Sequence, residues 1–263
     1  MSREAELRST LVALSDTKLL LGYHYGEWTF GPPAIEAGIA ACSMAQEEFG
    51  HTRLLNGILK REFELEIDPL ADERSPGAFA SIAFLDHPLE GWVELVAANA
   101  VVDLALSLVL SSFEGGDFQP LARAVPKMLI EERFHTDHAE GWVRVIEAGE
   151  PAPREALARA LARAVRDVAA YFGPPGHDAN LVRSGARTTD DDALRERLFA
   201  RIAGLIEDPA TVGLERQDAR WSLIEPLEWD PWDGDRRRLS AGGPDQGMLD
   251  ELRGTKNVAF KSA

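Results

Sequence analysis

The sequence predicts an all-α fold, and two observations support this. Leu and Ala recur at three- and four-residue intervals through the first two thirds of the chain, whereas the Val/Ile/Thr alternation typical of strands is scarce. With 263 residues, 45% of them apolar, the chain is long enough to bury one large helical core. We therefore predict a helical domain over residues 1–208, followed by an irregular Trp/Pro/Gly-rich tail over 209–263.

The first two helical segments form one predicted hairpin. Segment one, about 3–30, carries an apolar ladder that Lys18 interrupts, and it ends at Gly31-Pro32-Pro33. The ladder consists of Leu7, Leu11, Leu14 and Leu21. Segment two covers about 34–61. The stretch 68–88 that follows is rich in turn-forming residues, and this predicts a crossover connection between two helical hairpins.

The second hairpin and two further helices complete the helical domain. Segment three, about 89–113, is apolar around its circumference and is expected to be central, and segment four covers about 120–148. Additional helices are predicted at 153–172 and 190–207. The tail is either disordered or a docked strap, and its three tryptophans favour docking, since an unbound tail would expose them. They are Trp221, Trp229 and Trp232.

Composition excludes several function classes. The chain has 28 Lys and Arg against 44 Asp and Glu, a formal charge of −16, which argues against a nucleic-acid or anionic-membrane partner. The sequence contains no stretch of about 18 uncharged apolar residues, so it predicts no membrane-spanning helix. A single cysteine, Cys42, cannot by itself hold an iron–sulfur cluster. We expect a soluble cytoplasmic protein.

Two Glu-x-x-His motifs carry the predicted chemistry. Glu48 and His51 lie in segment two, and Glu132 and His135 lie in segment four. Three residues apart on a helix, each pair shares one face, so that a carboxylate oxygen and an imidazole nitrogen can reach the same metal. Ferritin-like di-iron and di-manganese bundles use this motif on two helices, together with one inward carboxylate from each of the other two. The sequence therefore predicts a ferritin-like four-helix bundle.

The remaining carboxylates are assigned to Glu27 in segment one and Asp103 in segment three. Asp103 and Glu132 are equidistant from the break at 114–120, so an antiparallel hairpin places them level. Glu27 lies close to the end of segment one, and it would be level with Glu48 only if about 28–36 rose as an extended stretch. Glu47 and Glu131 precede the ligands and are expected to face solvent or to support them.

Four carboxylates and two imidazoles would suit two iron ions, or manganese, better than zinc. Reductive activation of dioxygen would need electrons from elsewhere. Because the chain has no Gly-rich dinucleotide motif, a separate reductase is implied.

These motifs resemble a known family over about residues 10–150. Gly26-Glu27-Trp28 with Gly31-Pro32, the Glu48–His51 motif, Val102-Asp103 and the run Glu131–His135 are similar to the phenylacetyl-CoA epoxidase (multicomponent phenylacetate oxygenase) proteins. The resemblance implies a di-iron site at Glu27, Glu48, His51, Asp103, Glu132 and His135. It also implies that dioxygen supplies one oxygen atom to the ring of an aromatic acyl-CoA.

The resemblance leaves the role of the chain open. The Asp103–Glu132 spacing is like that of the family's catalytic subunit, whereas the chain length is more like that of its second ferritin-like subunit, which generally lacks a complete ligand set. The leading hypothesis is a di-iron monooxygenase that forms homo- or hetero-oligomers with a related subunit. The alternatives are a non-catalytic partner subunit and a metal-storage or peroxide-consuming protein.

Overall fold

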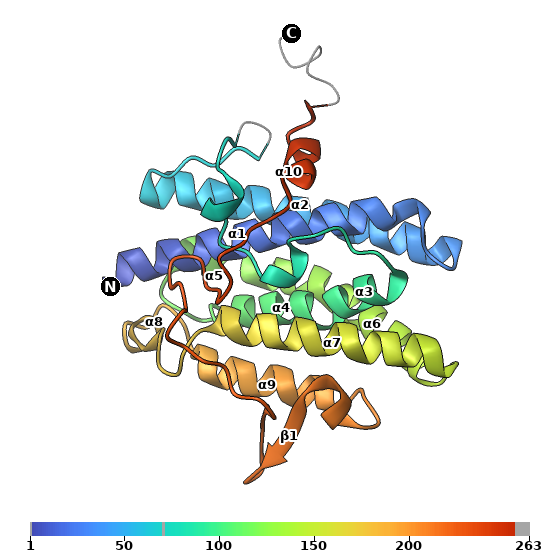
Figure 1. The fold of residues 1–263 in the computed structure, drawn as a ribbon. Helices are drawn as coiled ribbons and strands as arrows, with labels where there is room; N and C mark the ends of the chain where they lie inside the picture. The colour runs from blue at the N-terminus through green and yellow to red at the C-terminus, as the bar shows by residue number, and fades with distance from the viewer. Residues whose placement is uncertain (1, 70–71, 256–263) are drawn as a thin grey trace.

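Four long helical elements form the centre of the computed structural model, which describes residues 2–69 and 72–255 (Figure 1). Three of these elements are single helices, and the fourth is a composite of three consecutive segments. The single helices are α1 (Arg3–Glu27), α2 (Ile35–Phe63) and α6 (Val125–Glu147), and the composite consists of α3 (Trp92–Ala97), the π-helical η4 (Ala98–Asp103) and α4 (Leu104–Ser111). The predicted all-α, ferritin-like fold is confirmed.

Shorter elements surround this bundle. The helix α7 (Pro151–Phe172) packs against α3 and η4, and α9 (Asp191–Ala203) packs against α4. The other helical elements are η1 (Trp28–Phe30), η2 (Pro76–Ala78), η3 (Ala83–Leu85), α5 (Gln119–Ala122), α8 (Ala179–Arg183), η5 (Pro209–Val212) and α10 (Gln246–Leu252). A two-stranded antiparallel hairpin, β1 (Leu214–Gln217) and β2 (Arg220–Leu223), pairs Leu214 with Leu223.

The turn between α1 and α2 is tight. Residues Trp28–Phe30 form the 3-10 turn η1, and α2 begins at Ile35, so there is no extended rise over 28–36. Gly38 lies so close to this turn that a Cβ atom there would stand 2.4 Å from the carbonyl oxygen of Thr29. The two helices therefore run antiparallel directly from the last turn of α1 and the first turn of α2, which decides which residues of α1 are level with Glu48.

Helix α1 is buried almost all round from Thr10 to Tyr25, although it carries many polar side chains. These side chains have partners inside the protein. The hydroxyl of Ser15 donates to Asn56 Oδ1 at 2.6 Å, and Asp16 accepts from the Arg74 guanidinium at 2.7 Å and 3.0 Å. Burial of a polar group is tolerated when it is hydrogen-bonded. Helix α1 can therefore lie in the centre of the bundle although polar side chains occur on all its faces.

The segment 92–111 is the part of the described chain that is long and apolar enough to cross a membrane. Of its most apolar window, 72% is buried inside the protein. Burial of this kind is expected for the core helix of a soluble bundle, as predicted for segment three.

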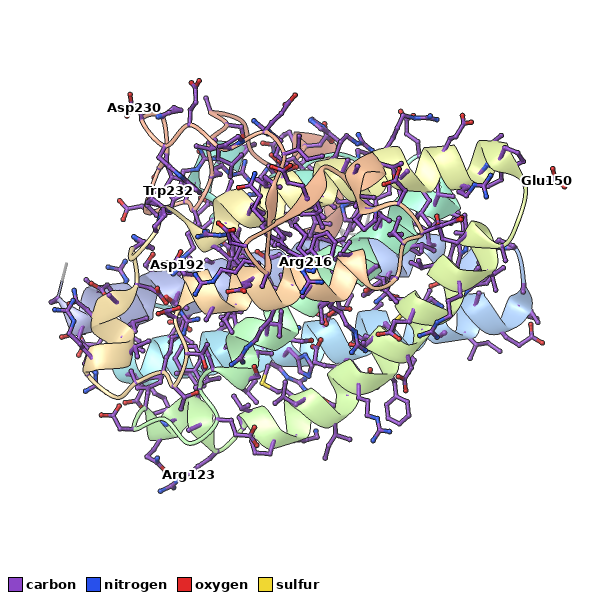
Figure 2. All side chains as sticks on the ribbon, turned by 90° about the horizontal axis from the view of Figure 1, so that it is seen from below. Arg123, Glu150, Asp192, Arg216, Asp230 and Trp232 are labelled. Carbon is purple, nitrogen blue, oxygen red and sulfur yellow. The ribbon has the colours of Figure 1, made fainter. Side chains whose placement is uncertain are left out.

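The described part of the tail, residues 209–255, docks on the bundle as a strap. The indole N–H of Trp232 donates to the carbonyl of Ala170 at 2.9 Å at the end of α7, and Met248 and Leu249 of α10 are buried. Figure 2 shows the loop that carries Asp230 and Trp232 laid over the helices. The tail is not wholly irregular, because it includes the β1–β2 hairpin and α10. The assignment of 209–263 as a separate unit remains a prediction.

Two buried arginines fasten this strap. The guanidinium of Arg238 donates to both Asp86 carboxylate oxygens at 2.8 Å and 3.0 Å and to the Ser81 carbonyl at 2.6 Å. Arg237 donates to Asp191 at 3.1 Å and to the Thr10 hydroxyl at 3.0 Å. The tail therefore supplies charges that compensate buried aspartates of the bundle.

We expect Arg238→Ala to lower the free energy of unfolding by about 3–5 kcal/mol, because it leaves Asp86 buried without its cation. Arg216→Ala, at an exposed position of β1, is the matched control and should change stability by less than about 0.5 kcal/mol. Urea unfolding followed by circular dichroism measures both. Equal stability of the two variants would show that the contact of Arg238 with Asp86 contributes nothing to the fold.

Candidate metal centre

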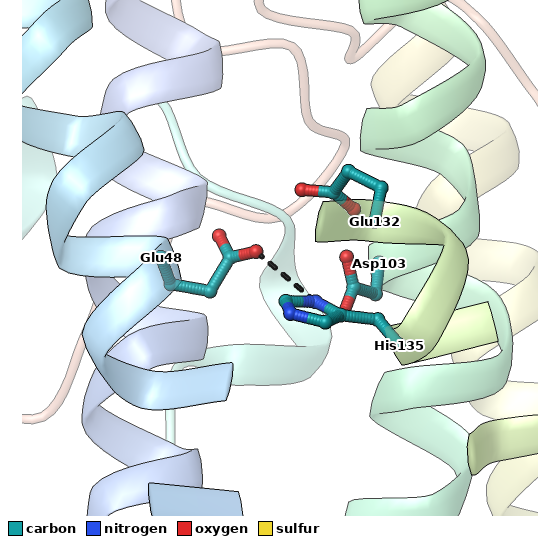
Figure 3. A group of neighbouring side chains, drawn as sticks. All are labelled: Glu48, Asp103, Glu132 and His135. Atoms are coloured by element: carbon teal, nitrogen blue, oxygen red, sulfur yellow. Dashed lines mark hydrogen bonds and ion pairs between the residues drawn. The ribbon is translucent and has the colours of Figure 1, made fainter. Parts of the chain in front are cut away.

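A group of four buried side chains lies where the two hairpins meet. Glu48 reaches in from α2, Asp103 from the end of η4, and Glu132 and His135 from α6 (Figure 3). Each side chain offers one ligand atom, and these atoms lie within 4.8 Å of one another. The group could therefore hold a metal ion. The register argument correctly places Asp103 beside Glu132.

The two histidines are oriented alike, and the orienting carboxylates come from the opposite helix. His135 has Nδ1 2.9 Å from Asp103 Oδ2 and 3.5 Å from Glu48 Oε1, and its Nε2 lies 2.7 Å from Glu47 Oε2. His51 has Nδ1 3.2 Å from Glu132 Oε1, and its Nε2 lies 2.8 Å from Glu131 Oε2. Glu47 and Glu131 thus fix the ring orientation from outside, an arrangement common around metal-binding histidines.

Lys18 is the residue that sequence reasoning missed. Its side chain is fully buried, and its Nζ lies 3.0 Å from both carboxylate oxygens of Glu48 and 2.6 Å from Glu132 Oε1. The signal was present in the sequence, since Lys18 interrupts the apolar ladder of α1. A cation on a buried face requires buried anions, and Glu48 and Glu132 are those anions.

Glu27 lies elsewhere. It is exposed at the last residue of α1, nine residues beyond Lys18, and this corresponds to about 13.5 Å along a helix. The α1 residue whose backbone faces Glu48 is Gly22, and Lys18, one turn earlier, reaches Glu48 with its ammonium, whereas Glu27 lies beyond the site. The structure therefore does not bring Glu27 into the group with the other five predicted residues, and α1 presents an ammonium where a four-carboxylate site would have its fourth acid.

Further donors from the protein satisfy the other carboxylate oxygens. The Tyr25 hydroxyl donates to Asp103 Oδ2 at 2.6 Å, and the Ser107 hydroxyl donates to Glu132 Oε2 at 2.6 Å. Within the described part of the chain, Asp103 Oδ1 and His51 Nδ1 are buried polar atoms without a hydrogen bond. The carboxylates are thus held largely by N–H and O–H groups of the protein.

Three other polar residues, two near the end of α1 and His138 on α6, have their hydrogen-bond partners outside the group. The His24 imidazole Nε2 is 3.0 Å from the carbonyl of Leu85, and the Tyr23 hydroxyl donates to Glu251 at 2.9 Å. His138 contacts the group only indirectly, because its Nδ1 lies 2.8 Å from Asn99 Oδ1 and the Asn99 amide donates to Asp103 at 3.3 Å.

The buried cations and carboxylates of the group shift one another's pKa values. Burial by itself would lower the pKa of Lys18, but the charges of Glu132, Glu48 and Asp103 outweigh burial and raise this pKa. Burial would also lower the pKa of His135, yet Asp103 and the neighbouring glutamates raise it to about 10. Both groups are therefore cationic at neutral pH.

The carboxylates respond to these two cations differently. Burial raises the pKa of Glu48 and of Asp103. Burial acts in the same direction on Glu132, but the Lys18 ammonium and the nearby His51 hold its pKa well below its usual range. The Lys18 ammonium, which lies between Glu48 and Glu132, compensates buried carboxylate charge within the protein itself.

A family model described as "Phenylacetic acid catabolic protein" matches residues 1–223. No curated protein matches the chain. The matched region includes the whole bundle and all the residues of the cluster.

We expect Tyr25→Phe to lower the free energy of unfolding by about 1–3 kcal/mol, because Asp103 loses a buried donor. Tyr171→Phe is the matched control: Tyr171 is equally buried, but its hydroxyl has no hydrogen-bond partner among the described residues. The control should change stability by less than about 1 kcal/mol. Urea melts compare the two, and an equal loss would show that the contact with Asp103 is immaterial.

The His135 imidazolium makes stability depend on pH. Its pKa of about 10 lies above the ordinary value of 6.5, so its contribution is complete below pH 6.5 and is lost as the pH rises through 10. We expect the free energy of unfolding of the wild-type protein to fall across that interval, and the fall to be smaller in His135→Gln. Denaturant melts at a series of pH values test this, and identical slopes in the two proteins would contradict it.

Proposed function

The chain belongs to the phenylacetic acid catabolic protein family, and on that premise we propose that it is the non-catalytic, ferritin-like partner subunit of a multicomponent phenylacetate oxygenase. In this role it would bind a catalytic homologue that holds the metals and the aromatic acyl-CoA, while a separate reductase supplies the electrons. The proposed location is the cytoplasm. The family and the buried carboxylate/His group support the coarser assignment to phenylacetate catabolism.

The single observation that carries the partner role is the position of Lys18. Its ammonium lies 2.6 Å from Glu132 and 3.0 Å from Glu48, so it takes the space between two carboxylates that a cation would share. A metal ion there would have to displace a buried cation from its ion pairs. In its present arrangement the residue set does not fit two metal ions, since α1 gives an ammonium in place of a carboxylate.

The surface of the chain supports a partner role. Seven of the eight exposed large hydrophobic side chains among the described residues lie on η1, α2 and α6. They are Phe30, Ile35, Ile39, Phe49, Ile130, Phe134 and Val145. The helices α2 and α6 are neighbours, joined by the pairs Glu47–His135 and Glu131–His51. Exposed apolar side chains concentrated on neighbouring helices are typical of a surface that binds another protein.

A dioxygen-activating oxygenase is the second candidate, and one observation favours it. Both histidines direct Nδ1 toward the carboxylates while carboxylates fix Nε2, and Asp103 Oδ1 is a buried acceptor without a hydrogen bond. Such a donor set suits iron or manganese once the ammonium is absent. Among the residues that the structure describes, no particular contact favours a metal-storage or peroxide-consuming role.

We expect the purified chain to contain substoichiometric iron and manganese, including after anaerobic loading, and to consume no dioxygen with a reductase and an aromatic acyl-CoA. Co-expressed with a homologue that has a carboxylate at the position of Lys18, it should purify as a stable mixed complex. Metal analysis by mass spectrometry, an oxygen electrode and size-exclusion chromatography provide the measurements. Stoichiometric metal together with oxygen consumption by the chain alone would favour the second candidate.

Two variants refine the binding experiment. Phe134→Glu places a charge on the exposed face of α6 and should weaken the mixed complex by about tenfold or more. Ile224→Glu changes an exposed apolar residue just after β2, away from the α2 and α6 faces, and should leave the complex intact. Equal effects of the two substitutions would show that α6 is not part of the interface.

A further inference from the structure

The Lys18 ammonium is surrounded by carboxylate oxygens, as a bound metal ion would be. Three carboxylate oxygens from two different helices lie within 3.0 Å of its Nζ, and the side chain is excluded from solvent. The cation joins α1 to α2 and α6. A dinuclear site in a ferritin-like bundle joins the same helices, with metal ions between their carboxylates.

The rest of a metal site is preserved around this cation. The ligand atoms of Glu48, Asp103, Glu132 and His135 already lie within 4.8 Å of one another. His51 adds a nitrogen 3.2 Å from Glu132 Oε1, and Glu131 fixes its ring from the other side. A donor set that needs no large rearrangement loses little free energy on binding an ion.

We infer that Lys18 is a resident cation that closes an otherwise preserved metal site, and that replacing this one side chain opens the site to a divalent first-row metal ion. This inference rests on the proposed function, because it explains by one residue why the chain would bind no metal. It goes further by assigning the remaining donors a definite ligand class: iron(II), manganese(II) or cobalt(II), which accept mixed carboxylate and imidazole sets.

Charge and position both point to glutamate as the residue that reopens the site. Replacing Lys18 by Glu changes the charge of the cluster by two units, which one divalent ion restores. Since the Lys18 side chain points into the space between Glu48 and Glu132, a glutamate there would direct its carboxylate toward the place where α1 of a four-carboxylate site supplies its ligand. Without metal the variant would bury uncompensated carboxylates, so metal and folding should be linked.

The experiment compares four forms of the full chain: wild type, Lys18→Glu, Lys18→Ala and Lys60→Glu. Lys18→Ala makes room without adding a ligand. Lys60→Glu makes the same charge change at an exposed position and controls for adventitious binding to the acidic surface. Each protein is incubated anaerobically with cobalt(II) chloride and desalted. Metal content by mass spectrometry, visible d–d absorption and thermal unfolding with and without cobalt are then measured.

We expect Lys18→Glu to retain about one cobalt ion per chain or more, to absorb in the visible range and to unfold at a higher temperature with cobalt than without it. Lys18→Ala should bind cobalt more weakly, through Glu48, Asp103, Glu132 and His135. Wild type and Lys60→Glu should retain none. If Lys18→Glu fails to fold even with cobalt, Lys18→Ala decides the question.

The outcomes separate this inference from the proposed function. If neither Lys18 variant retains cobalt, the inference is overturned, while a metal-free wild type leaves the partner role standing. If the wild type itself retains stoichiometric cobalt with visible absorption, Lys18 does not close the site, and the partner role loses the observation that carries it. Retention by Lys60→Glu equal to that of Lys18→Glu would assign the binding to the surface and overturn the inference.

Discussion

The ion pair of Lys18 with Glu48 and Glu132 is the interaction on which the arrangement of the bundle depends. It joins α1, α2 and α6 in a place where all three side chains are excluded from water. Removing one member of such a buried set leaves charges without compensation, whereas the complete set is tolerated because each charge has partners. Tyr25 and Ser107 complete the arrangement by donating to Asp103 and Glu132. Lys18 and Tyr25 of α1, together with Ser107 of α4, therefore donate to the carboxylates that α2, η4 and α6 supply.

The two Glu-Glu-x-x-His segments act as a crossed pair. In each segment the first glutamate fixes the histidine of the opposite helix, and the second glutamate enters the buried group. These two crossed contacts make the facing surfaces of α2 and α6 polar, and they fix how the two helices are aligned along their length. The contacts of Glu47 and Glu131 also explain why the histidines direct Nδ1 inward although it is the Lys18 ammonium that lies between the carboxylates.

A second set of buried charges holds the tail to the bundle. Arg187 contacts Asp178 and Asp191, and Arg237 of the tail shares Asp191. Arg238 compensates Asp86, which lies at the end of the connection between the two hairpins. The acidic composition of the chain is thus not only a property of its surface, because several aspartates are buried and depend on arginines that are distant in sequence.

The sequence by itself determined the helical class, the four bundle helices and the placement of Glu48, His51, Asp103, Glu132 and His135, because helical periodicity and hairpin symmetry are local properties of the chain. It also indicated a docked tail, since three tryptophans in a short stretch need a surface to bury them. It could not determine which residue of α1 is level with Glu48. That depends on the tight η1 turn and on the close contact at Gly38, which together put Lys18 in the site and leave Glu27 exposed. Only the tertiary structure could show that a lysine interrupting an apolar ladder compensates buried acids from two other helices, since pairing between distant segments has no local signal.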